Sequence, residues 1–259
     1  MEKNIEYLLC TKDMARLGQH FLRDEQLVMR IAERVPVGAS TLEIGGGQGA
    51  LTGLLLRRTN SLTVYEIDDG LYQQLRRMFQ GKIVLENTDF RYAKFSAYDV
   101  VVSSVPFYIS LKLMLKLYFE PGWKLGLFIL QNEFVKKLTA HPGSHIYRRI
   151  SVLAQCVWDV KVIEEVSRER FQPTPHVDAE FIELRPRFDL PLSFRHTLKN
   201  VADAVFRFPN KTLINALRLS LPDEDVEKVL NLFGNDILSK RVRNTDAITF
   251  AQISKVVNV

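Results

Sequence analysis

The stretch Leu42-Glu43-Ile44-Gly45-Gly46-Gly47-Gln48-Gly49-Ala50 decides the fold of this chain. An apolar segment of strand type leads into the glycines, and a helical pattern with Leu51, Leu54 and Leu55 on one face follows them. Glycines in such a turn permit positive φ and let a ligand touch the backbone, while the unpaired N–H groups of the helix start attract an anionic group. The stretch therefore predicts a nucleoside-binding loop in an open α/β sheet.

Two acidic residues follow the glycine run, each after a further predicted strand. The strand at 61–65 leads to Glu66, which is placed to accept hydrogen bonds from ribose hydroxyls. The strand at 82–85 leads to Asp89, whose carboxylate can accept a hydrogen bond from an exocyclic adenine amine. A glycine run with a later acid also satisfies the dinucleotide fingerprint, so these residues alone leave a dehydrogenase or a small-molecule methyltransferase as alternatives.

A fourth predicted strand, at 98–103, ends in the turn Ser104-Val105-Pro106-Phe107. Pro106 stops the strand, so the turn leaves the sheet at the edge where ligands bind in open α/β folds. An adenine N6 amine is a poor nucleophile, because its lone pair is delocalised into the ring. The Ser104 hydroxyl and the Val105 carbonyl are candidate acceptors that would free this lone pair, and Phe107 is the candidate to stack the base. These four residues are the predicted catalytic residues, and the target base must be unpaired or flipped out.

Eight segments, taken in order, resemble the motifs of the rRNA adenine N6-dimethyltransferases, the KsgA/Erm family. They are residues 17–22, the glycine loop, Glu66, Asp89, and residues 104–110, 131–135, 149–155 and 171–178. The resemblance runs from about residue 16 to residue 187 and resumes at 240–244, so it covers most of the chain. Eight ordered matches are far more specific than one glycine motif.

The resemblance implies a Rossmann-like doubly wound methyltransferase sheet, S-adenosylmethionine as the cofactor, and an adenosine in rRNA or in a pre-ribosomal particle as the substrate. The cofactor-binding residues predicted from the motifs are Gln19, His20, Leu22, Gly45, Gly47, Gly49, Glu66, Ile67, Asp89, Phe90 and Ser104.

Two residues depart from the family's pattern: Gly46 replaces the usual proline, which only loosens the glycine loop, and Ser104 replaces an asparagine. The target-base motif of the family is Asn-Leu/Ile-Pro-Tyr/Phe, so Ser104 stands where asparagine is expected. Serine keeps one acceptor oxygen but is shorter, and we expect the contact with the amine to be weaker by about 0.5–1.5 kcal/mol. This departure leaves open whether one or two methyl groups are added. It also keeps alive a second hypothesis, a nucleic-acid-binding relative with the cofactor fold and little activity.

Periodicity and proline positions predict two domains. Residues 1–186 form the expected catalytic α/β domain, in which 150–162 and 178–184 are predicted to be extended and to pair at one sheet edge. Residues 185–191 are expected to link it to a small all-helical RNA-binding domain at 187–259. Its helical patterns lie at 194–208, 211–219, 222–233 and 246–256.

Composition narrows the class of protein further. The formal net charge of +5 suits a phosphate-rich partner such as RNA. Two cysteines in 259 residues make no disulfide framework, which favours the cytoplasm, and no apolar run is long enough for a membrane span. His141 and His145 have the spacing of a metal pair, but Pro142-Gly143 breaks the helix that such a pair needs, so no metal is expected. A monomer is the default expectation.

Overall fold

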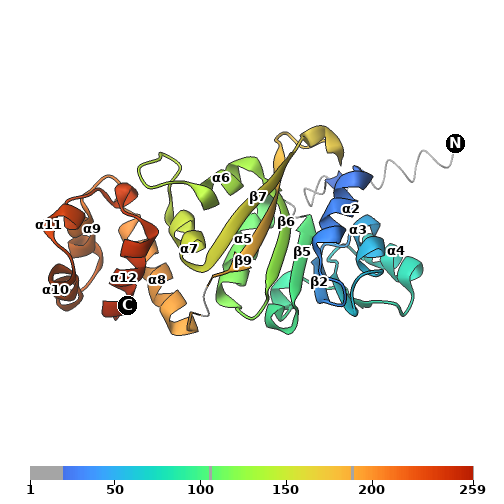
Figure 1. The fold of residues 1–259 in the computed structure, drawn as a ribbon, viewed down its shortest axis with the longest axis horizontal. Coiled ribbons are helices and arrows are strands. Elements are labelled where there is room, and N and C mark those ends of the chain that lie inside the picture. The colour runs from blue at the N-terminus through green and yellow to red at the C-terminus, as the bar shows by residue number, and fades with distance from the viewer. Residues whose placement is uncertain (1–19, 105–106, 188–189, 259) are drawn as a thin grey trace. The chain divides into compact units, whose positions relative to one another are not determined.

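The computed structural model describes residues 20–104, 107–187 and 190–258 (Figure 1). Contacts divide the chain into two compact units. The first comprises Met1–Asn132 and Lys161–Arg185, and the second comprises Glu133–Val160 and Pro186–Val259.

The first unit is built on a mixed sheet. Among the described residues this sheet has seven strands in the order β4-β3-β2-β5-β6-β9-β7. The strands are β2 (Ser40–Ile44), β3 (Ser61–Tyr65), β4 (Val84–Glu86), β5 (Val100–Ser104), β6 (Leu125–Gln131), β7 (Trp158–Val166) and β9 (Ala179–Pro186). Neighbours from β4 to β6 are parallel, and β9 pairs antiparallel with β6. The strand order and the parallel pairing are those of the predicted Rossmann-like doubly wound sheet.

The order of the strands reverses at β2, which has β3 on one side and β5 on the other. In Figure 1, β2, β5 and β6 run side by side. Connections leave such a reversal point in opposite directions, so a crevice opens at the carboxyl ends of the strands. The glycine loop follows β2 directly and therefore lies at this crevice.

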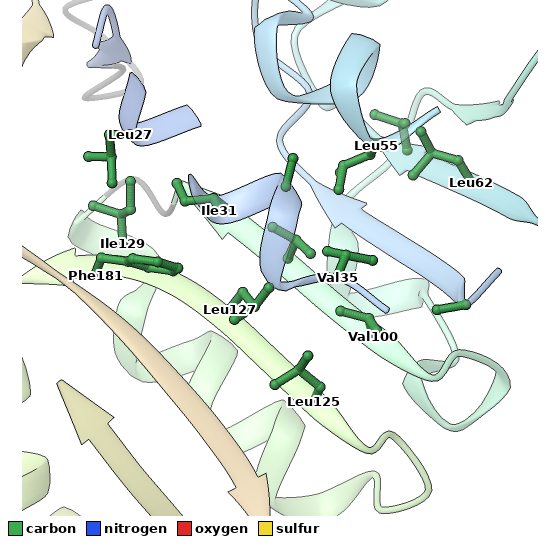
Figure 2. Close-up of a cluster of buried hydrophobic side chains, with 14 of the residues drawn as sticks. Leu27, Ile31, Val35, Leu55, Leu62, Val100, Leu125, Leu127, Ile129 and Phe181 are labelled. Carbon is green, nitrogen blue, oxygen red and sulfur yellow. The ribbon is translucent and has the colours of Figure 1, made fainter. Parts of the chain in front are cut away.

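Near-continuous apolar runs explain why these strands lie inside the sheet. Every residue of β6 except Gln131 is buried, and Val100, Val101 and Val102 of β5 are no more than 1% exposed. Strands covered on both faces need such runs. Figure 2 shows side chains of one core cluster, in which helix and sheet residues such as Ile31, Leu127 and Phe181 come together.

Helices connect the strands of the first unit. They are α2 (Glu25–Arg34), α3 (Ala50–Leu55), α4 (Asp69–Phe79) and α5 (Ser110–Phe119), with short 3-10 helices η1 (Phe90–Tyr92), η2 (Phe95–Ala97), η3 (Phe107–Ile109) and η4 (Arg168–Arg170). Asp24 caps α2 by accepting a hydrogen bond from the Leu27 N–H, and Asp68 caps α4 through the Leu71 N–H. Each cap satisfies a backbone donor that the helix itself leaves free.

A separate two-stranded ribbon joins distant parts of the first unit. Strand β1 (Phe21–Leu22) pairs antiparallel with β8 (Phe171–Gln172). Just before β1, the Nδ1 atom of His20 lies 2.7 Å from the carbonyl oxygen of Pro173. The segment that precedes α2 is thereby attached to the segment that follows β7.

The second unit is helical. Its helices are α6 (Asn132–Thr139), α7 (Arg149–Val157), α8 (Leu192–Val205), α9 (Leu213–Ser220), α10 (Asp223–Leu232), α11 (Asn235–Leu238) and α12 (Ala247–Val256), with η5 (Val242–Asn244). A chain of aromatic rings lies in its core, where the ring centroids of Tyr147 and Phe206 are 5.9 Å apart and those of Phe206 and Phe250 are 5.5 Å apart. Within the described ranges, no helix has the length and apolar composition to cross a membrane.

One prediction about local structure was wrong. Residues 150–162 were expected to be extended, but Arg149–Val157 form α7 and the strand begins only at Trp158. The β-branched residues of this segment favour a strand, yet the helix buries Ile150, Val152 and Val157 and packs against α8 and α12. The contacts also group residues 133–160 with the C-terminal helices, whereas the expected first domain was 1–186.

Candidate cofactor and substrate site

A pocket lies in the first unit at the carboxyl ends of β2, β3 and β5. The predicted cofactor-binding residues that line it are His20, Leu22, Gly45, Gly47, Glu66, Ile67, Asp89, Phe90 and Ser104. Gln19 lies outside the described residues. Residues from five separate segments of the sequence therefore converge on one cavity.

The glycine loop forms one wall of this pocket. Gly45 has a φ of +75°, and a Cβ atom placed there would have no heavy atom within 4 Å, so the backbone is open to a ligand. A Cβ atom on Gly47 would lie 3.2 Å from the ring of Phe21, which also lines the pocket. Gly49 does not line it, because this residue packs so closely against α4 that a Cβ atom would lie 2.9 Å from Phe79.

Glu66 holds the glycine loop in place. Its side chain is buried, and its Oε2 accepts a hydrogen bond of 2.9 Å from the Gly47 N–H while its Oε1 accepts one of 2.9 Å from the Asp68 N–H. Burial raises the pKa of Glu66, and the backbone N–H groups of Asp68 and Gly47 oppose this shift. Each oxygen keeps a further lone pair, so the carboxylate can also accept hydrogen bonds from ribose hydroxyls.

Asp89 supplies a second carboxylate. Partial burial raises its pKa, but hydrogen bonds from the Arg91 side chain and backbone outweigh that effect, so the pKa of Asp89 is lowered overall. These bonds run from Arg91 N to Oδ1 at 2.9 Å and from Arg91 Nε to Oδ2 at 3.0 Å. Asp89 is therefore ionised at neutral pH, as an acceptor for an adenine amine should be.

The turn after β5 is only partly described. Ser104 ends the strand and lines the pocket, whereas Val105 and Pro106 lie outside the described residues. Phe107 does not line the pocket but packs, partly buried, against the core cluster. Its ring centroid is 6.2 Å from that of His20, which does line the pocket, and the two planes are 31° apart.

Glu43 and Tyr108 are two of the pocket residues that the sequence analysis did not single out. Glu43 on β2 is buried, and burial raises its pKa to about 8, with the Thr52 hydroxyl lowering it and Glu66 raising it further. Its Oε2 has no hydrogen-bond partner within the described part of the chain. An acidic residue inside an apolar strand two positions before Gly45 was the signal that could have identified it. Tyr108 is 57% exposed, and nothing in its local sequence distinguished it.

The described residues contain no group of three or more His, Cys, Asp or Glu side chains arranged to hold a metal ion. Two carboxylates of the pocket are instead engaged by other groups, Glu66 by backbone N–H groups and Asp89 by Arg91.

The family is decided by a match over nearly the whole chain. Residues 11–257 match the family model described as Ribosomal RNA adenine dimethylase. The chain belongs to this family. Membership confirms the resemblance and the predicted class of enzyme, an rRNA adenine methyltransferase, and it removes the dehydrogenase alternative.

Individual relatives agree with the family match. The chain is 29% identical to the ribosomal RNA small subunit methyltransferase A of Mesomycoplasma hyopneumoniae, over 92% of this chain and 94% of the relative. It is 32% identical to the probable ribosomal RNA small subunit methyltransferase A of Natronomonas pharaonis, over 92% of this chain and 90% of the relative.

Two solved structures resemble the fold. A dimethyladenosine transferase from Plasmodium falciparum superposes with a TM-score of 0.78 at 22% identity, covering 90% of this chain and 96% of that one. The 23S rRNA methyltransferase ErmE superposes with a TM-score of 0.67 at 26% identity, covering 91% and 98%. Both likenesses extend beyond the sheet to most of the chain.

Proposed function

We propose that this chain transfers methyl groups from S-adenosylmethionine to the N6 atom of an adenosine in small-subunit ribosomal RNA. The observation that carries the proposal is the convergence of the glycine loop, two carboxylates and Ser104 on one pocket at the carboxyl ends of the sheet. The names of the relatives, which act on small-subunit rRNA, support the choice of substrate.

The residues of the pocket fit an adenosyl cofactor. Gly45 offers an open backbone surface, and the buried Glu66 can accept from two adjacent hydroxyls of a ribose. The ionised Asp89 can accept from the exocyclic amine of an adenine, while Ile67 and Phe90 supply apolar contacts for a flat base. S-adenosylmethionine, when bound, supplies a methyl group activated by a sulfonium.

At the target adenosine, the chain's own task is to free the lone pair of the N6 amine. Ser104 can accept one N–H bond of this amine at the mouth of the pocket, and the Val105 carbonyl is proposed as the second acceptor. Phe107 is proposed to stack the base, a contact worth about 1–3 kcal/mol in proteins that bind single strands. In-line positioning then carries the reaction without a covalent intermediate.

The RNA partner accounts for the basic charge of the chain. We propose that the substrate is bare small-subunit rRNA or a pre-ribosomal particle, that the enzyme works in the cytoplasm as a monomer, and that residues 187–259 take part in RNA binding.

The decisive experiment maps N6-methylated adenosines in the rRNA of cells with and without this gene, together with methyl transfer in vitro. Radiolabelled methyl groups should pass from the cofactor to naked small-subunit rRNA or to precursor particles from the deletion strain. Mapping should place them at adenosines that lose the modification in that strain. Absence of any such adenosine would refute the proposed activity.

Ser104 supports a second candidate, a nucleic-acid-binding family member with little activity. Serine is shorter than the asparagine expected at this position and offers the amine one acceptor instead of a longer amide. Cofactor affinity without methylation of naked rRNA or of precursor particles would favour this candidate.

A further inference from the structure

A network of alternating charges lies beside the ribbon of β1 and β8. Arg170 Nη1 forms an ion pair with Asp24 Oδ2 at 3.0 Å and donates a hydrogen bond of 3.1 Å to Glu164 Oε1. Glu164 also accepts two hydrogen bonds of 2.9 Å from Arg30, one on each oxygen. We call Asp24, Arg30, Glu164 and Arg170 the clamp network. It connects the N-cap and the middle of α2 with β7 and η4.

The backbone continues the same connection toward the pocket. The Arg170 carbonyl accepts a hydrogen bond of 2.8 Å from the Arg23 N–H, and the next two residues form β8 against Phe21 and Leu22. His20 then reaches the Pro173 carbonyl. The clamp network thus lies at one end of the ribbon, and the His20 contact lies at the other.

Strand β1 of the ribbon and the residue before it supply three consecutive residues of the pocket lining, His20, Phe21 and Leu22. The ring of Phe21 lies against the glycine loop, where a Cβ atom on Gly47 would be only 3.2 Å away. A ribbon of two residues per strand gains little from its own pairing, since even longer isolated hairpins are marginal in water. Phe171 and Leu22 pack the ribbon against the core cluster, and the polar groups at its two ends hold it in addition.

We propose that Arg170 is a positioning residue of the cofactor site, which holds residues 20–22 over the glycine loop through Asp24 and Glu164. This inference rests on the proposed function only in taking the pocket to be the site of S-adenosylmethionine. Arg170 itself does not line the pocket, so it acts through the ribbon.

The expected effect is moderate because the network is partly open to solvent. The side chains of Arg170, Asp24, Glu164 and Arg30 are 36%, 23%, 26% and 41% exposed. Arg170→Ala should weaken the binding of S-adenosylhomocysteine about five- to tenfold, measured by calorimetry without RNA. The KM for S-adenosylmethionine should rise by a similar factor, while kcat at saturating cofactor stays within about twofold of the wild type. Arg170→Lys should recover part of the affinity, because an ammonium keeps the charge without the fork of a guanidinium.

Arg185→Ala is the matched control. Arg185 lies on β9 of the same unit, where it pairs with Glu183 at 2.7 Å and is 57% exposed, and it does not line the pocket. The Arg185→Ala substitution removes an arginine and an ion pair but leaves the ribbon intact, so cofactor affinity should stay unchanged. Thermal unfolding of both variants separates a general loss of stability from a local one.

Asp24→Ser provides a second route to the same question. Serine can still cap α2 through the Leu27 N–H but cannot pair with Arg170 as an anion. It should weaken cofactor binding as Arg170→Ala does, and the double variant should lose less than the sum of the two single losses. Raising the salt from about 0.1 M to about 0.5 M should narrow the difference between wild type and Arg170→Ala.

The inference is overturned if Arg170→Ala binds S-adenosylhomocysteine as the wild type does, if Arg185→Ala loses as much affinity, or if kcat falls while KM stays constant. These results are distinct from failure of the proposed function. If cofactor affinity falls in Arg170→Ala as expected but the wild type methylates no rRNA, the proposed substrate is contradicted and the positioning role stays intact. A wild-type protein with no affinity for the cofactor would overturn both.

Discussion

The cofactor wall of the pocket, formed by residues 45–47 and Glu66, is held by backbone hydrogen bonds to a buried carboxylate. The base wall, as we propose it, consists of Ser104 and Tyr108 in the pocket lining and of Phe107, which lies outside the lining with its ring centroid 6.2 Å from that of His20. Tyr108 is 57% exposed. The first wall has its shape before any ligand arrives, which lowers the cost of binding. The second wall is the one that we propose for the target base. Changes in the cofactor wall should therefore alter cofactor affinity, and changes in the base wall should alter turnover.

The largest effect is expected for Glu66→Gln. The substitution removes a charged acceptor from the Gly47 N–H and from the ribose, and it turns an amide NH2 group toward a backbone donor. Hydrogen bonds to charged groups are worth about 1.5–3 kcal/mol each, so cofactor affinity should fall by about 100-fold or more. Calorimetry with S-adenosylhomocysteine measures this fall. Glu86→Gln is the control, because Glu86 is an exposed side chain on the neighbouring strand β4. Equal losses of cofactor affinity in the two variants would contradict the role of Glu66.

The cofactor wall should also be sensitive to pH, because Glu43 lies behind it on β2. Its pKa is raised from 4.5 to about 8 in the folded protein, so folding takes up a proton at Glu43 between these values. The stability that this group contributes is fully present below pH 4.5 and is lost as the pH rises to about 8.

Glu43→Gln mimics the protonated side chain and should be free of this loss. In urea unfolding without cofactor, the free energy of unfolding of Glu43→Gln should rise relative to that of the wild type by a few kcal/mol from about pH 5 to about pH 8. Above about pH 8 the difference should stay constant. Asp99 lies outside the pocket and has a pKa shift of the opposite direction, since Lys124 and Ser40 lower its pKa to about 2. A constant difference between Glu43→Gln and wild type across this pH range would show that Glu43 is already ionised in the folded state.

The base wall can be tested with Phe107→Ala. Loss of the proposed stacking contact should cost about 1–3 kcal/mol, which lowers kcat/KM for rRNA about 10- to 100-fold. Affinity for S-adenosylhomocysteine should change little, because Phe107 does not line the pocket. Tyr92→Ala removes an aromatic side chain that is 77% exposed and also outside the pocket lining, so it controls for loss of surface aromatic area. A large loss of cofactor binding in Phe107→Ala would place the residue in the cofactor wall instead.

The difference between the two walls also explains what the sequence could predict. The order of apolar strands, the glycine turn and the acids at strand ends follow from local pattern, because parallel strands bring their carboxyl ends to one edge. Glu66, Asp89 and Ser104 were predicted in this way, and all three line the pocket.

Features that depend on distant packing were not predictable. The β-branched residues of segment 149–157 favoured a strand, but the segment forms a helix that packs against α8 and α12. His20 and Leu22 were expected only by resemblance, since their position depends on pairing with residues 171–173, far away in the sequence. The orientation of Tyr108 toward the pocket similarly requires the whole turn after β5.

The smallest effect, and the sharpest test of the base wall, is expected for Ser104→Asn. Asparagine restores the family's longer acceptor, which should strengthen the contact with the amine by about 0.5–1.5 kcal/mol and hold or raise the rate by up to about tenfold. Because a second transfer needs the already methylated amine to be held again, the product should also shift from N6-methyladenosine toward N6,N6-dimethyladenosine. Mass spectrometry of nucleosides from the treated rRNA measures both products. Ser103→Asn is not a suitable control, because the Ser103 hydroxyl donates to the Ile44 carbonyl inside the sheet. Ser96→Asn, at an exposed serine of η2 outside the pocket lining, is the better comparison. A large loss of activity in Ser104→Asn would show that this side chain does not face the amine.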